Sequence, residues 1–297
     1  MLDKLISMEA FVKTVDNGSF SAAAERMNMS QQMVARHVAS LETKLGMRLL
    51  NRTTRRHGLT AEGQIYYQRC KFILAEIDDA EGIAQTSQKE PRGKLRVSAP
   101  ITLGRYRIMP IITEFLRRYP AVEVELELND RLVDLVEEGF EIAVRIGKLN
   151  DSQLIARELT PHRFVLCATP GYLQKHGTPS SPEELRQHEC LGYGFNTRPG
   201  HKTWQLTHKG KTQTIRVHSR LHLTDAAALL QATLDDVGIL LAPHYVVQEK
   251  IHSGELVFVL SGYQGPSRPI HLLYHPARQQ SAKLKQFIEL CLNRLRT

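Results

Sequence analysis

Residues 20–38 read FSAAAERMNMSQQMVARHV, and this stretch decides the fold of the N-terminal part of the chain. The spacing of its small and apolar residues predicts two short helices joined by a tight turn. Asn28 stands where such a turn needs a positive φ angle, which Asn tolerates better than most residues. Ser30 then offers a side-chain oxygen that caps the second helix. The stretch predicts a helix-turn-helix motif, with an ordinary helical hairpin as the alternative.

The second helix of such a motif enters the major groove of DNA with its N-terminal residues against the base edges. Gln and Arg suit this position because each forms paired hydrogen bonds with adenine or guanine. We therefore expect Gln31, Gln32 and Arg36 to contact bases, with Ala35 on the same face of the helix. Ser30 is expected to contact the phosphate backbone.

Positive charge is concentrated beside this motif. Residues 1–60 hold nine Lys and Arg against five Asp and Glu, a balance of +4, which is half of the net charge of +8 of the 297-residue chain. This charge favours a polyanionic partner. Residues 53–58 form a compact polar turn that we expect to be a wing on DNA; it contains Arg55 and Arg56, and Arg52 directly precedes it. Arg55 is predicted to enter a minor groove; phosphate contact by Arg55, or by Arg52 and Arg56, is the alternative.

The run from Ala10 to Gly63 resembles, almost residue by residue, the N-terminal pattern of the LysR-type family of bacterial transcriptional regulators. The family usually has Gly at the turn where this chain has Asn28. It usually has Ser where this chain has Ala35, so a hydroxyl commonly presented to DNA is absent here. The resemblance covers essentially the whole chain. At residues 98–104, 141–147 and 168–173 the sequence looks like the branch of the family that contains the CrgA-like regulators.

This resemblance implies an α/β fold in three parts. They are an N-terminal winged helix-turn-helix, a long linker helix, and a two-lobed effector domain that is periplasmic-binding-protein-like (type 2). The expected ranges are 1–60 for the DNA-binding domain, 61–90 for the dimerisation linker helix and hinge, and 91–297 for the effector domain. Within the effector domain, we expect lobe one at 91–161 and 268–297 and lobe two at 162–267.

The resemblance also implies a function. We expect a transcriptional regulator, not an enzyme, that binds double-stranded promoter DNA as a dimer or tetramer, with higher assembly as a further option. A small-molecule effector is an expected partner, and RNA polymerase is another if the protein is an activator. We expect a cytoplasmic protein without membrane contact, because the first residues lack an apolar signal core and no window approaches membrane-spanning length.

A long helix is predicted after Thr60, since no Pro occurs until Pro91. Apolar residues in it alternate steps of four and three, as in a coiled-coil seam. An amphipathic helix lying on its own domain would show similar spacing. In the LysR resemblance this helix joins two subunits, which makes dimerisation the preferred interpretation for Tyr66, Cys70, Ile73 and Ile77.

Beyond the polar hinge at 85–93 the apolar period changes and predicts alternating strands and helices. Strands are expected near 94–99, 122–128 and 140–146, with a short helix around Leu132 and Leu135. This βαβαβ order implies a parallel sheet covered by helices. A second lobe is expected to contain a hairpin and a helix capped by Thr224, before a strand at 270–274 and a helix at 281–295 return to lobe one.

Ligands of open α/β sheets bind beyond the carboxyl ends of the strands, near helix N-termini that favour anions. We expect a small carboxylate there, bound by Ser98 and Thr102 from the first strand–helix turn and assisted by Arg145. Thr224 has the corresponding place in lobe two, and Asn196 lies in a polar loop. The alternative is structural: the hydroxyls cap helices, Arg145 is paired internally, and Asn196 is an ordinary loop residue.

Other classes of protein fit the sequence less well. It contains no His-Glu-x-x-His zinc motif and no Gly-x-Ser-x-Gly nucleophile motif. We expect no cofactor and no metal, since the four cysteines are scattered without Cys-x-x-Cys spacing. A redox pair of Cys167 and Cys190 is the alternative to inert thiols. A purely architectural DNA-binding protein is disfavoured, because it would not need a two-lobed domain.

Overall fold

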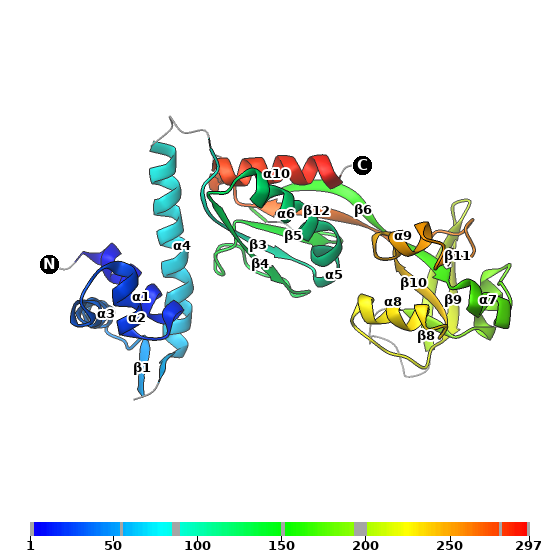
Figure 1. Cartoon of the computed structure of the whole chain (residues 1–297), viewed down its shortest axis with the longest axis horizontal. Coiled ribbons are helices and arrows are strands. Elements are labelled where there is room, and N and C mark those ends of the chain that lie inside the picture. The colour runs from blue at the N-terminus through cyan, green and yellow to red at the C-terminus, as the bar shows by residue number, and fades with distance from the viewer. Residues whose placement is uncertain are drawn as a thin grey trace.

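The computed structural model describes residues 3–53, 56–84, 90–149, 152–192, 201–278 and 281–295. The N-terminal module packs three helices and a two-stranded wing beside the start of a long fourth helix (Figure 1). Its elements are α1 (Lys4–Asn17), α2 (Phe20–Met27), α3 (Gln31–Leu45), β1 (Leu50–Thr53), β2 (Arg56–Leu59) and α4 (Ala61–Ala84).

The turn between α2 and α3 has the predicted conformation. Asn28 is left-handed, with a φ angle of 52°, and its backbone N–H donates to the carbonyls of Ala24 and Glu25. Ser30 caps α3, because its hydroxyl accepts a 3.2 Å hydrogen bond from the amide of Met33. The helix-turn-helix prediction is therefore confirmed, and the left-handed cap explains why Asn is suitable at this position.

Part of the α4 face that we assigned to dimerisation, from Tyr66 to Ile73, packs on its own module. Cys70 is fully buried in the module core, and Tyr66 and Ile73 are partly buried against that core. The ring of Tyr66 lies 6.1 Å from that of Phe11 in α1. The prediction is therefore wrong for Cys70. Steps of four and three mark one apolar face of a helix, and this face is satisfied within the chain.

The remaining elements form one mixed sheet and its covering helices. The described strands of the sheet follow the order β4-β3-β5-β12-β6-β10-β7, with β11 paired to β6. Their bounds are β3 (Gly93–Ala99), β4 (Val122–Leu128), β5 (Ile142–Ile146), β6 (Ile155–Ala168), β7 (Cys190–Gly192), β10 (Ile239–Pro243), β11 (Val257–Phe258) and β12 (Ser267–Tyr274).

Helices and a separate hairpin cover the sheet. A continuous helical run in lobe one comprises α5 (Ile101–Leu103), η1 (Gly104–Ile108) and α6 (Met109–Arg118). Lobe one also contains η3 (Pro276–Arg278) and α10 (Ala282–Leu295). The helices of lobe two are α7 (Pro170–His176), η2 (Pro182–Gln187), α8 (Ala226–Leu234) and α9 (His244–His252). The hairpin consists of β8 (His201–His208) and β9 (Lys211–His218).

The long strand β6 connects the two lobes. Its first part, from Ile155 to Arg163, pairs antiparallel with β12 in lobe one. Its last part, from Phe164 to Ala168, pairs with β10 and β11 in lobe two. The parallel order β4-β3-β5 agrees with the predicted βαβαβ unit, whereas β12 is antiparallel to both neighbours. The expected double crossover between two α/β lobes is present (Figure 1).

The sheet of lobe one has one apolar face and one face that is charged at β3 and β4 and apolar around Ala143 and Leu273. Leu95 and Val97 of β3 are fully buried in the core formed with α6 and α10. On the other face, Lys94 and Arg96 lie beside the acidic residues of β4. The short helix expected around Leu132 is wrong: residues 129–140 form turns, and Leu132 is 82% exposed. The segment still covers part of the sheet, because Leu135 and Phe140 are buried against Ala143 of β5 and Leu273 of β12.

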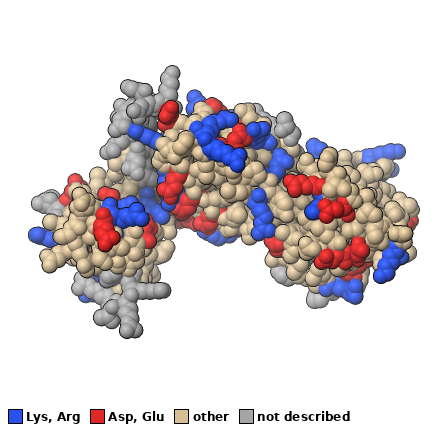
Figure 2. Space-filling view, in the orientation of Figure 1, with Lys and Arg blue, Asp and Glu red and all other residues tan. Residues whose placement is uncertain are grey.

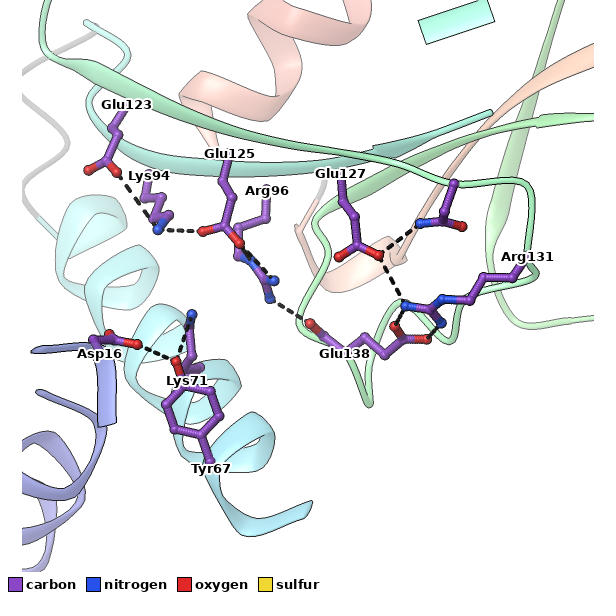
Figure 3. A network of polar contacts seen from close by, with 11 residues as sticks. Asp16, Tyr67, Lys71, Lys94, Arg96, Glu123, Glu125, Glu127, Arg131 and Glu138 are labelled. Carbon is purple, nitrogen blue, oxygen red and sulfur yellow. Dashed lines mark hydrogen bonds and ion pairs between the residues drawn. The ribbon is translucent and has the colours of Figure 1, made fainter. Parts of the chain in front are cut away.

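The helix α4 lies against this polar face (Figure 3). Arg69 of α4 forms a 3.1 Å ion pair with Glu137, and the guanidinium of Arg278 lies 4.7 Å from the ring of Phe72. Within the module, the hydroxyl of Tyr67 donates to Asp16. Burial lowers the pKa of the neighbouring Lys71 ammonium despite the opposing field of Asp16.

A second polar cluster continues from these contacts across lobe one (Figure 3). Arg96 is paired with Glu125 at 3.0 Å and donates to the backbone carbonyl of Glu138. Arg131 is paired with Glu138 and, at 3.1 Å, with Glu127. These pairs lie within lobe one, whereas Arg69–Glu137 and Phe72–Arg278 are contacts that join α4 to that lobe.

The cysteines are buried and separated. Cys167 pairs with Leu240 and Cys190 with Ile239, which are consecutive residues of β10. Since consecutive residues of a strand point to opposite faces of a sheet, the two thiols lie in different cores, one against each face of the sheet. The alternative of a Cys167–Cys190 redox pair is therefore wrong for this fold.

We predict that the thiols are inert in the folded protein. Burial raises the pKa of Cys70, Cys167 and Cys190 to about 12 in each case, and it also raises that of Cys291. Because the thiolate is the reactive form, Ellman's reagent at pH 8 should release almost no colour until denaturant is added, and then titrate four thiols. A fast-reacting thiol in the native protein would contradict this burial.

Candidate functional site

The N-terminal part of α3 presents the predicted recognition residues to solvent. Gln31, Gln32 and Arg36 are exposed, whereas Val34 and His37 on the opposite side are buried. His37 holds α3 against α1, since its Nδ1 lies 3.0 Å from the hydroxyl of Ser7. The three polar side chains therefore form the outer face of a helix that is fixed from behind. Ala35 is half-buried at the edge of this face.

The wing is attached to the same helix by a residue that sequence reasoning missed. The carboxylate of Glu42 in α3 accepts hydrogen bonds from the amides of Leu49 and Leu50, at 2.8 Å and 3.2 Å. Glycine is also required at position 63, because a Cβ there would lie 2.0 Å from the carbonyl oxygen of Leu49. A carboxylate eight residues before the start of β1 gives no sequence signal for this role, so contact geometry alone reveals it.

The structure describes only some of the predicted wing arginines. Arg52 pairs with His57, and Thr53 with Arg56, across the two-stranded wing. Only the backbones of Arg52 and Arg56 are described, and Arg55 lies outside the described residues. Ser30 is exposed, but its hydroxyl caps α3.

Two predicted effector residues are brought together inside lobe one. Ser98 is fully buried and its hydroxyl accepts a 3.1 Å hydrogen bond from the guanidinium of Arg145. Arg145 is 8% exposed and also donates to the carbonyl of Val144 at 2.7 Å. Burial, and then the charge of Arg131, lowers the pKa of Arg145. The internal pairing that we considered as the alternative is what the structure contains.

Thr102 lies at the start of the helical run, where the first backbone amide already donates a hydrogen bond within the chain. It is half-buried, and the preceding amide of Ile101 donates to the carboxylate of Asp130 at 3.1 Å. Asp130 is exposed and was not foreseen, because it stands 29 residues away in sequence. A helix N-terminus favours negative charge, and here the chain supplies that charge itself.

Thr224 faces solvent in lobe two, and it does not cap the following helix. The cap is Asp225, whose carboxylate accepts a 2.7 Å hydrogen bond from the amide of Ala228. The expectation of a Thr224 cap is therefore wrong by one residue. Asp225 also lies 3.9 Å from the guanidinium of Arg105, so this ion pair joins lobe two to lobe one. Asn196 lies outside the described residues.

Among the residues that the structure describes, no group of three or more His, Cys, Asp and Glu side chains is placed to hold a metal ion. None of the described helices is both long enough and apolar enough to cross a membrane.

Known proteins resemble this chain over both parts of its length. The family described as bacterial regulatory helix-turn-helix protein, lysR family, matches residues 5–64, and the LysR substrate binding domain matches residues 88–296. The HTH-type transcriptional regulator CrgA of Neisseria meningitidis serogroup C is 36% identical over 291 residues, covering 97% of this chain and 96% of that protein.

Solved structures agree with these sequence matches. The structure of CrgA, described as a LysR-type transcriptional regulator from Neisseria meningitidis, is 33% identical, covers 97% of each chain and gives a TM-score of 0.61. The full-length Vibrio cholerae virulence activator AphB, a member of the LTTR protein family, is 30% identical and gives a TM-score of 0.61, covering 97% of this chain and 98% of that one. The chain belongs to the LysR family of bacterial transcriptional regulators, with its DNA-binding helix-turn-helix and its effector-binding domain.

Proposed function

We propose that this regulator binds promoter operators as a homo-oligomer, a dimer or a tetramer, and that a small anionic metabolite changes how the oligomer sits on the DNA. The observation that carries the proposal is the exposed row of Gln31, Gln32 and Arg36 on a helix whose opposite face is buried. These side chains match the base-edge chemistry of the major groove. RNA polymerase would be a further partner of an activator, and we place the protein in the cytoplasm with its DNA.

Base recognition by Arg36 can be separated from charge with the Arg36→Lys variant. Lys keeps the positive charge but loses the paired hydrogen bonds of a guanidinium. We expect discrimination at one base pair of the operator to fall by about 1–3 kcal/mol, as measured by sequencing the DNA selected from a random library. The salt dependence of binding should stay as in the wild type, because the number of phosphate contacts is unchanged. Unaltered base preference would contradict our orientation of α3.

We also propose that the part of α4 outside the module core contributes to self-association. Ile77 is half-buried, and Ile65 on the same helix is 69% exposed. If Ile77 lies between two chains, Ile77→Asp places a charge without a partner in a desolvated position. Sedimentation should then show smaller species and weaker operator binding. Ile65→Asp is the matched comparison. If only Ile65→Asp loses the oligomer, the contact between chains lies in the first half of α4. If neither variant changes the oligomer, α4 does not form the contact.

The effector is proposed to bind beside Thr102, in competition with Asp130. An anion that approaches the N-terminus of the helical run must share the Ile101 amide with this carboxylate or displace it. Arg145 is buried against Ser98, so it supports the site by its field and by holding Ser98 in place. Thr224 is proposed to approach from lobe two, where Asp225 is held by Arg105. Asn196 remains a candidate on the same lobe.

This competition is testable once a carboxylate has been found by thermal-shift screening of the full-length protein. A ligand at one hundred times its dissociation constant should stabilise the protein by about 2.7 kcal/mol. Asp130→Asn removes a nearby negative charge and should tighten binding roughly fivefold, since like charges at 4 Å repel by about 1 kcal/mol even in water. Thr102→Val should weaken it. Calorimetry on both variants decides: weaker binding in Asp130→Asn would show that the effector is not an anion at this position.

A further inference from the structure

A groove of about 1610 Å³ lies beside the crossover strands, away from the predicted effector residues. It is bounded by β6 from Glu158 to Leu166, by the first turn of α9, by the segment from Phe258 to Ser267, and by the C-terminal end of α10. Ser98, Thr102, Arg145 and Thr224 do not line it. The groove therefore touches both lobes at the point where the chain passes between them.

One wall of the groove is apolar and aromatic. Phe258 lines it and is 44% exposed, which is unusual for so large an apolar side chain. The His244 ring lies parallel to that of Phe258, at 6.2 Å and 11°. Phe164 and Tyr263 contribute further aromatic surface. A ligand with an apolar body would bury this surface.

The groove also carries an excess of positive charge. Arg107, Arg163 and Arg294 line it, against Glu158 as the carboxylate among its lining residues. Arg294 is held by Glu114 at 2.8 Å. In the described part of the chain, no ion pair or hydrogen bond engages the guanidinium of Arg107 or Arg163. On the face in view, Lys and Arg side chains lie along the junction of the two lobes (Figure 2).

From this combination we infer that the groove is a second ligand site, which binds an organic anion with an apolar body. The apolar body would pack on Phe258 and Phe164, and the anionic group would pair with Arg107 or Arg163. Guanidinium groups form strong charge-assisted hydrogen bonds with carboxylates and sulfonates of this kind. Such a ligand contacts η1 and α10 of lobe one and α9 of lobe two, so it stabilises one angle between the lobes over others.

The fluorescent sulfonate 8-anilino-1-naphthalenesulfonate is a suitable probe for the full-length protein, because it combines an aromatic body with a fixed negative charge. The double variant Arg107→Gln, Arg163→Gln should bind it at least about tenfold more weakly, as expected for lost hydrogen bonds to a charged group. Arg117→Gln, an exposed arginine of α6 outside the groove, is the matched control and should bind as the wild type does. The uncharged N-phenyl-1-naphthylamine should bind the wild type at least about tenfold more weakly than the sulfonate does.

The single variant Phe258→Ser keeps the inference testable if the double variant fails to fold. Its side chain is 44% exposed and lies outside the buried core, so folding should survive while probe affinity falls. Thr102→Val and Asp130→Asn should leave probe binding unchanged, which separates this site from the proposed effector position. Wild-type affinity in the arginine and Phe258 variants would overturn the site. Equal binding of the uncharged probe would overturn its anionic class, and loss in Thr102→Val would assign the probe to the other cleft.

Discussion

The antiparallel ladder of β6 with β12 is the constraint on which the rest of the effector domain depends. Because β6 continues from β12 in lobe one to β10 in lobe two, the lobes share one sheet, and a change in the angle between them must twist this strand. The Arg105–Asp225 ion pair is a further contact between the two lobes. Residues 158–161 and 163–166 of β6 also line the groove with Phe258, so a ligand in that groove would contact this strand.

The sheet of lobe one links β6 to the DNA-binding module, because the linker helix packs against it. One face is filled by α6 and α10, and on the other face β3 and β4 present charged groups beside a small apolar cluster around Ala143 and Leu273. The linker helix lies on that polar face through Arg69 and Phe72. The position of the recognition helix relative to the lobes thus depends on contacts made by side chains, and not on a continuous apolar core. This arrangement allows the module to be re-seated without unfolding either part.

Patterns local in sequence predicted the fold well, and contacts between distant residues limited the rest. Asn28 and Ser30 specify their turn because the φ angle and the cap are set within a few residues. Cys70 was misassigned because packing on the module core and packing on a second chain require the same spacing of apolar residues. Asp130 at the Ile101 amide and Glu42 beneath the wing depend on tertiary placement, for which a single sequence gives no periodic signal.

The charged seat of α4 has a consequence for measurements at different ionic strengths. Its pair of Arg69 and Glu137 is largely exposed, with 45% and 64% of the side chains accessible, so added salt screens it. Salt also weakens the binding of DNA phosphates. A salt titration of operator binding therefore reports two processes at once: loss of phosphate contacts, and release of the module from its own lobe. The slope of such a titration overestimates the number of phosphates contacted unless the second process is measured without DNA.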